Sequence, residues 1–436
     1  MFPCVRGPAP PGSLLAWKNH FHQASARRAP VRTLPAVRLP APYDRLLIPV
    51  YLPSTFTAVA NQAMLLLLPL YALQVSGSAA FAALVMALRG VGVPVFDVPA
   101  GLLVGRFGDK SVLLGGFVLL AGSMFGMAFA TEQWMIALLA IPLGAGHAAW
   151  FLGWLTYITH SCPPELRGQA TAVNAGIQRM GALAGPLAGG IVAESLGYPA
   201  AYLGAAALCG IALLISFVYT DDVRPESPAR SGHLRTIGRI LADNRSVFAT
   251  AGSVAIVFQI MRATRQLLVP LFGVLVGLDP ATIGLIYSLA ALVDVSLSYP
   301  VGIAMDRWGR KWTGVPSIVG FVAGLAMLPF VEGFWTLLAA ALMLGVGNGL
   351  STGLVMIIGM DLSPPGQRGQ FLGVWRLIGD VGWVGGPLLA GLLVELFSMA
   401  AASLFAGALG VLGGLVLLFL VPETSRIPRE RESGSG

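Results

Sequence analysis

The stretch GLLVGRFGDK at residues 101–110 decides the fold, because it recurs as GIAMDRWGRK at residues 302–311. The same offset of 201 residues relates Arg167-Gly168-Gln169 to Arg368-Gly369-Gln370, without a gap between the copies. One unit of about 200 residues has therefore been used twice. In a chain this apolar, the repeat predicts a membrane protein of two similar halves that can rock about a site between them.

The composition supports a membrane protein, since 56% of the 436 residues are hydrophobic and only 11% are charged. These values lie far outside the range of soluble proteins. Twelve apolar stretches are each long enough to cross ~30 Å of hydrocarbon. They are residues 46–74, 80–105, 111–131, 134–160, 168–194, 199–220, 247–275, 281–306, 312–331, 335–361, 369–395 and 399–421. We predict an all-α membrane protein with twelve transmembrane helices in two pseudo-symmetric six-helix bundles.

The polar segments define the domain organisation. We expect an N-terminal bundle at 46–220 and a C-terminal bundle at 247–421, joined by a cytoplasmic linker at 221–246. Residues 1–45 are basic and rich in proline, which predicts a disordered cytoplasmic tail rather than a signal peptide. Residues 422–436 are expected to form a second cytoplasmic tail.

The basic residues predict the orientation in the membrane. Five arginines lie within the predicted spans, and every other Lys and Arg falls on the side that carries both termini. By the positive-inside rule that side is cytoplasmic, in a plasma or inner membrane. The net charge of +7 is thus a topology signal, and the dispersed basic residues do not favour a nucleic-acid partner. The three cysteines lack a metal-binding spacing, so we expect no metal site, and we expect a monomer.

The repeated segment combines glycines, which permit a sharp turn, with a cluster of charges at the end of a helix. It resembles the loop between helices 2 and 3 of the major facilitator superfamily, commonly G-x-x-x-D-R-x-G-R-K. The conformational loop residues are Gly101, Arg106, Gly108, Asp109 and Lys110 in the first copy, and Gly302, Asp306, Arg307, Gly309, Arg310 and Lys311 in the second. The first copy departs from the pattern, with Gly105 in place of the Asp and Asp109 in place of an Arg. Asp361 is placed to bond the second cluster, whereas its counterpart His160 is a poorer partner.

A second motif lies in the predicted helix 168–194. Its residues Gly181, Gly185, Pro186, Gly189 and Gly190 allow close helix contact and a bend. The motif resembles that of the drug:proton antiporter branches, which implies export, although any close-packed pair of bent helices would select Gly and Pro. Many such exporters carry an Arg in helix 4, but here Ala140 lies near that position. Helix 4 therefore gives no support for proton coupling. RPESPAR at 224–230 and PET at 422–424 resemble fragments of sugar transporters, but the Gly-Pro motif argues against sugar uptake.

Ionisable side chains inside the membrane are costly and mark candidate functional sites. In the superfamily, helices 2 and 11 abut across the two halves, as do helices 5 and 8. The resemblance therefore suggests two bridges, Arg376–Asp97 and Arg179–Asp294, which gate or hold the halves. Asp380 lies one turn from Arg376 on the same helical face and is the candidate proton carrier.

The resemblance also implies that helices 1, 4, 7 and 10 line a substrate cavity. The candidates are Asn61, Gln62, His147, Trp150, Arg262, Arg265, Gln266 and Asn348. Intramembrane arginines outnumber aspartates, which suits an anionic or zwitterionic substrate, and Trp offers an apolar surface for an amphipathic one. The alternatives stay open that the arginines bond backbone carbonyls and that His147 and Trp150 only pack.

The leading prediction is a secondary transporter that exports small amphipathic molecules by alternating access, driven by a proton gradient without another cofactor. Uptake or facilitated transport of an organic anion is the alternative, and a non-transporting receptor on the same fold is a third. The sequence has no nucleophile elbow, metal cluster or phosphate loop, so we do not expect an enzyme.

Overall fold

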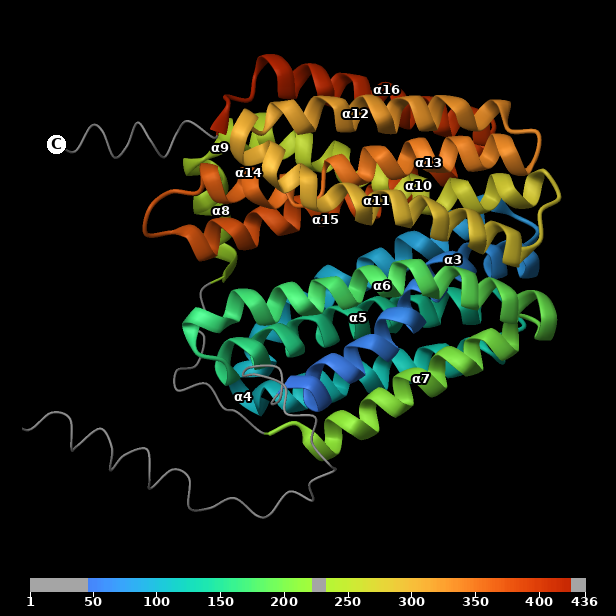
Figure 1. The fold of residues 1–436 in the computed structure, drawn as a ribbon, viewed down its shortest axis with the longest axis horizontal. Coiled ribbons are helices and arrows are strands. Elements are labelled where there is room, and N and C mark those ends of the chain that lie inside the picture. Colours follow the sequence, from blue (N-terminus) through green and yellow to red (C-terminus); the bar gives the residue numbers. More distant parts are fainter. Residues whose placement is uncertain (1–45, 222–232, 425–436) are drawn as a thin grey trace, which may run out of the picture. The chain divides into compact units, whose positions relative to one another are not determined.

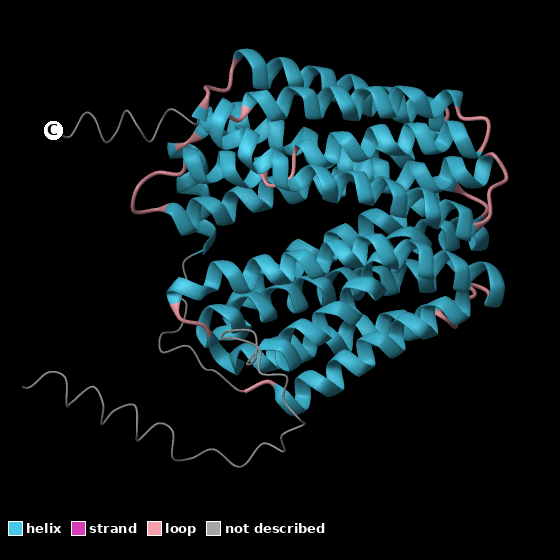
Figure 2. Ribbon diagram, in the orientation of Figure 1, coloured by secondary structure: helices cyan, strands magenta, loops and turns pink. Residues whose placement is uncertain are grey.

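The computed structural model describes residues 46–221 and 233–424, so the predicted tail 1–45, residues 222–232 of the linker and residues 425–436 lie outside the described residues. The described residues form helices joined by short loops (Figure 2). The N-terminal half comprises η1 (Leu47–Tyr51), α3 (Leu52–Ser76), α4 (Ala79–Met127), α5 (Gln133–Ser161), α6 (Pro164–Leu196) and α7 (Tyr198–Tyr219). The C-terminal half comprises η2 (Phe248–Gly252), α10 (Ser253–Leu275), α11 (Pro280–Trp308), α12 (Lys311–Met327), η3 (Leu328–Phe330), α13 (Phe334–Leu350), α14 (Leu354–Leu362), α15 (Arg368–Leu396) and α16 (Met399–Phe419). Figure 1 shows the two halves in blue to green and in yellow to red.

The membrane-length segments lie where the apolar stretches predict them. Eleven segments of the described chain are long and apolar enough to cross a bilayer. The twelfth, α6, has 33 residues but is the least apolar of the long helices. Asn174, Gln178 and Arg179 lie along it and account for part of this polarity. The all-helical fold with paired six-helix halves is thus confirmed.

The repeated loop forms a turn at the same place in both halves. Gly108 has φ 83° and divides α4 into two spans without a loop, and Gly309 has φ 103° between α11 and α12. Both values are left-handed, a region that glycine enters at little cost. We call the end of the bundles that contains Gly108 and Gly309 the motif end, and the end that contains Gly197 and Gly277 the far end. Gly101 lies within α4 as well.

Two places differ from the sequence prediction. The stretch predicted as one helix at 335–361 is broken between α13 and α14 by a turn at residues 351–353, where Gly353 has φ 75°. The equivalent helix of the first half, α5, is continuous. The predicted linker contains two short helices, α8 (His233–Asp243) and α9 (Arg245–Val247). Helix α8 packs on α15, and its Ile240 is buried.

The halves meet along two pairs of helices, α6 with α11 and α4 with α15. Their closest approaches are near the far end. A Cβ on Gly190 would lie 2.3 Å from the carbonyl oxygen of Pro280, and a Cβ on Gly284 would lie 2.4 Å from that of Pro186. Gly391 of α15 leaves room for the Cβ of Ala83 of α4, which would lie 2.7 Å from a Cβ at this position. Glycine therefore brings the backbones of the two halves into direct contact at the far end.

Candidate functional site: a polar cavity between the two halves

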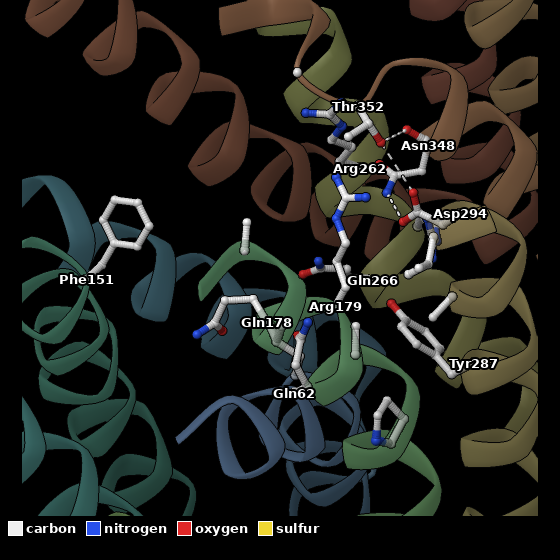
Figure 3. A pocket seen from close by; sticks show the side chains of 18 of the residues that line it. Gln62, Phe151, Gln178, Arg179, Arg262, Gln266, Tyr287, Asp294, Asn348 and Thr352 are labelled. Atoms are coloured by element: carbon white, nitrogen blue, oxygen red, sulfur yellow. Dashed lines mark hydrogen bonds between the residues drawn. The ribbon is translucent and has the colours of Figure 1, made fainter. Parts of the chain in front are cut away.

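A cavity of about 590 Å³ lies between the halves, within the usual range for small-molecule sites. Its walls come from α3, α5 and α6 on one side and from α10, α11, α13 and α15 on the other. Its lining residues with polar or aromatic side chains are Gln62, Phe151, Trp154, Thr171, Gln178, Arg179, Arg262, Arg265, Gln266, Tyr287, Asp294, Asn348, Thr352 and Trp383. Figure 3 shows Phe151 on one wall, apart from the polar side chains of α10, α11 and the α13–α14 turn. Gln62, Arg262, Arg265, Gln266 and Asn348 of the predicted set thus line one cavity.

The break between α13 and α14 supplies much of the polar wall. In the unwound turn, the carbonyl oxygen of Ser351 accepts from the N–H of Leu354 at 3.1 Å and from Arg262 at 3.0 Å, and Arg262 also donates to the Ser351 hydroxyl at 2.9 Å. Asn348 and Thr352 donate to the carboxylate of Asp294 at 2.5 and 3.5 Å (Figure 3). Interrupted helices beside a cavity are typical of transporter sites.

The structure does not form the expected Arg179–Asp294 bridge. Arg179 of α6 donates instead to the hydroxyl of Ser298, one helical turn from Asp294 on α11. The two halves are therefore joined here by an arginine–hydroxyl bond. The reason is that neutral donors of α13 and of the turn that follows it already bond the Asp294 carboxylate from within its own half.

Three predicted cavity residues lie in the packing of the N-terminal half, outside the cavity lining. Asn61 is 5% exposed and accepts a hydrogen bond of 3.1 Å from Arg89. Trp150 is 1% exposed, and its backbone lies against Gly116 in the second span of α4. His147 packs beside it, with 5.6 Å between the ring centres. The helical face of α5 that meets the cavity carries Phe151 and Trp154 instead.

The second expected bridge is present. Arg376 of α15 bonds Asp97 of α4 at 2.8 Å, and it is the ion pair that joins the halves within the described residues. Asp380 lies one turn from Arg376 along α15, near the charges of both Arg376 and Asp97. Its Oδ2 is buried and accepts no hydrogen bond from the described residues. The guanidinium of Arg376 also lies over the ring of Phe151 at 5.4 Å, so the charged group touches the wall of the cavity.

At the motif end of the second half, the loop motif is tied to the tail of the chain. Arg310 bonds Asp361 at 3.1 Å and Asp306 at 3.2 Å. Glu423, in the segment that resembles a sugar-transporter ending, accepts the backbone N–H groups of Arg310 at 2.7 Å and Lys311 at 3.1 Å. A carboxylate at a helix N-terminus is favourable because it binds unpaired N–H groups there. Residues 422–424 are predicted from the sequence to belong to a tail, but Glu423 of this segment caps the N-terminus of α12.

The first half carries the equivalent contact with the acidic and the basic residue exchanged. The 201-residue offset maps Arg310 onto Asp109 and Asp361 onto His160. Asp109 is fully buried and lies 2.5 Å from His160. The first copy departs from the family pattern at Asp109, and His160 compensates for this departure because it places a basic residue where the second half has Asp361.

Replacing His160 with alanine should destabilise the protein by about 1–3 kcal/mol, because the buried carboxylate of Asp109 would lose its partner. His160→Arg should retain most of the stability, since the guanidinium still supplies a hydrogen-bond donor to the Asp109 carboxylate. Thermal unfolding of the purified variants measures the difference. Equal stability of His160→Ala and the parent protein would contradict the pairing.

The glycines of the helix-bend motif serve two interfaces. Gly181, Gly185 and Gly189 lie against Ala58, Val59 and Ala63 of α3, whereas Gly190 lies against α11 of the other half. Pro186 lies inside α6 and lines the cavity. The motif therefore builds the N-terminal half and its contact with the C-terminal half at once.

Sequence reasoning missed several cavity residues, among them Gln178, Tyr287 and Trp383. Tyr287, Ala291 and Asp294 are spaced four and three residues apart, which places them on one helical face. The run GNGLSTG at 347–353 also indicates the break in its helix. These signals were present, but spacing alone does not show which face meets a cavity.

The fold and the cavity define a membrane transporter built from two six-helix halves. The family description of the Major Facilitator Superfamily matches residues 51–264 and 254–435, so the chain belongs to this family of transporters, which are not enzymes. Multidrug resistance protein MdtH of Aeromonas hydrophila is 27% identical over 335 residues, 72% of this chain and 80% of that protein. A solved POT family transporter in complex with a thioalcohol conjugated peptide has a TM-score of 0.72 at 13% identity, over 87% of this chain and 96% of that one. The nucleoside transporter NupG also has a TM-score of 0.72, at 15% identity, over 86% and 99% of the two chains.

Proposed function

We propose that this protein is a proton-coupled exporter of small amphipathic molecules. The observation that carries the proposal is the Asp97–Arg376 ion pair between the halves, with the buried carboxylate of Asp380 one turn away. The name of the relative MdtH, a multidrug resistance protein, supports export. The cavity offers aromatic walls and polar groups together, as an amphipathic substrate requires.

The conformation fits the loading step of an exporter. The positive-inside distribution of Lys and Arg supports a cytoplasmic motif end. The glycine contacts close the interface at the far end. Figure 1 shows the halves lying farther apart toward the end that contains α8 and α14. Substrate would then enter the cavity from the cytoplasm, and rocking of the halves would expose it to the other side.

The proton step follows from the competition of two carboxylates for one guanidinium. Arg376 neutralises Asp97 at 2.8 Å, while Asp380 has its buried oxygen without a bond from the described residues. Loss of a proton from Asp380 would draw Arg376 from Asp97 toward the Asp380 carboxylate, and rebinding of a proton by Asp380 would return the arginine to Asp97. Because Arg376 touches Phe151, and Trp383 follows Asp380 by three residues, this exchange is adjacent to the cavity wall.

Asp380→Asn should abolish transport driven by a pH gradient in proteoliposomes, because the amide cannot exchange a proton. Substrate binding and downhill exchange should persist. Glu395→Gln, on the same helix at the far end, is the matched control and should behave as the parent protein. Intact pH-driven transport by Asp380→Asn would rule out this proton carrier.

A second candidate is uptake or facilitated transport of an organic anion. It is favoured by the net positive charge of the cavity lining, which contains Arg179, Arg262 and Arg265 but one carboxylate, that of Asp294. Cationic, neutral and anionic dyes under an imposed pH gradient separate the alternatives. Inward anion flux without proton coupling favours uptake, and specific binding without any flux favours a receptor.

A further inference from the structure

The charges that line the cavity are not paired with one another. Arg179 donates to Ser298, and Arg262 donates to Gln259 and to Ser351. Asp294 accepts from the neutral groups of Asn348 and Thr352. All three side chains are thus hydrogen-bonded to neutral groups, and neither arginine has a carboxylate partner among the described residues. The cavity keeps an excess of positive charge.

Arg265 is the cation that this arrangement leaves open. Its side chain lines the cavity although the residue is only 8% exposed. Its guanidinium lies 5.7 Å from the ring centre of Tyr287 and has no hydrogen bond or ion pair to another group in the described part of the chain. Removing a guanidinium from water without a carboxylate or hydrogen-bond acceptor is unfavourable. An anion in the cavity would offset that cost.

Two neighbours complete a polar subsite beside Arg265. The hydroxyl of Tyr287 is buried and has no hydrogen-bond partner among the described residues, and neither has Oε1 of Gln266. Figure 3 shows the hydroxyl end of Tyr287 directed toward the side of the cavity where Gln266 lies. The tyrosine O–H can donate to an anion, whereas the Gln266 oxygen is an acceptor and would bind a donor group of the substrate. An arginine fork is the side chain best suited to a planar carboxylate.

We propose that the substrate is an organic anion whose carboxylate binds Arg265 and Tyr287, while its apolar body lies against Trp154, Phe151 and Trp383. The inference rests on the proposed function and narrows it to amphipathic molecules with an anionic head. Arg265 is the residue that selects the head, and the aromatic walls accept different bodies. A molecule of this kind fits the cavity of about 590 Å³.

Binding of three probes with one body and different heads tests the proposal: 2-naphthoate, its methyl ester and 2-naphthylmethylammonium. The protein is held in phosphatidylcholine nanodiscs, and affinities are measured by calorimetry. Naphthoate should bind about tenfold or more tightly than the other two, as expected for a hydrogen bond to a charged group. Arg265→Gln should remove this preference without weakening the ester, Arg265→Lys should keep part of it, and Tyr287→Phe should reduce it several-fold.

Arg239→Gln, an exposed arginine of α8 outside the cavity, is the control and should retain the preference for naphthoate. Arg179→Gln tests the alternative that another cavity arginine selects the head. Loss of the preference in Arg179→Gln but not in Arg265→Gln would overturn the assignment, as would equal affinities for the three heads in the parent protein. Competition by added phosphatidylglycerol would assign the site to a lipid headgroup and overturn a soluble substrate.

The transport assay separates this inference from the proposed function. Binding of naphthoate at Arg265 without export under a pH gradient would leave the anion subsite standing and overturn proton-coupled export. Export of the ammonium probe with no selectivity for naphthoate would support the exporter and overturn the anion subsite.

Discussion

Gly190→Leu should shift the protein out of the state with a closed far end, by about tenfold or more, and abolish transport. A Cβ at this position would lie 2.3 Å from the carbonyl oxygen of Pro280 and 3.0 Å from Cα of Ala281. Both contacts are backbone atoms of the other half, so no side chain can move aside. Overpacking of this kind costs ~1–3 kcal/mol, and about 1.4 kcal/mol is a tenfold change in an equilibrium.

The opening can be measured as a distance between spin labels at Ser195 and Leu275, which are exposed at the far ends of α6 and α10. The labels are placed on a background without the native cysteines, and the distance should lengthen in Gly190→Leu. Gly204→Leu is the control, since Gly204 of α7 has open space where its Cβ would be. An unchanged distance and unchanged transport in Gly190→Leu would contradict closure through this contact.

Breaking the ion pair between the halves should have the second large effect. Asp97→Asn or Arg376→Gln should lower pH-driven transport by roughly 5- to 150-fold, the usual range of coupling between sites. The free energy of unfolding should change by only about 1 kcal/mol or less, because Arg376 is 43% exposed and water screens the pair. The structural cost is therefore small and the functional cost large.

The exchanged pair, Asp97→Arg with Arg376→Asp, distinguishes a pair from two separate residues. It should recover part of the transport that either single variant loses, as a double-mutant cycle would show. The control is the exposed pair Arg239–Asp243 on α8, 3.9 Å apart, whose removal should leave transport unchanged. No recovery in the exchanged protein would mean that the two charges act independently.

Much of the fold could be predicted because it depends on local properties that the sequence repeats. The apolar stretches must form helices in a bilayer, since their backbone groups have no other partners there. Gly108 and Gly309 mark the two equivalent turns. The Asp97–Arg376 bridge was also within reach, because two opposite charges at similar depths on abutting helices have few alternatives.

The candidate site was less accessible to sequence reasoning. Arg179 and Asp294 lie at similar depths on abutting helices, as Arg376 and Asp97 do, yet they do not pair. Asp294 is bonded by Asn348, and Arg179 is bonded by Ser298. Asn61 and Trp150 occupy the predicted depth of the cavity but belong to the packing of the N-terminal half. A depth estimate does not specify the rotation of a helix about its axis, and this rotation decides which residues meet the cavity.

The sequence by itself determined the two-halved architecture, the membrane class and the residues at its turns, because hydrophobic length and glycine conformation act locally. Only the tertiary structure decided which charges are paired, that Glu423 caps α12, and that Arg265 faces the cavity without a carboxylate partner among the described residues. The physical reason is that two charged side chains pair only when they lie within 4 Å of each other. These side chains belong to helices that are far apart in the sequence. Their contacts follow from how the helices are rotated and broken, as at the turn between α13 and α14.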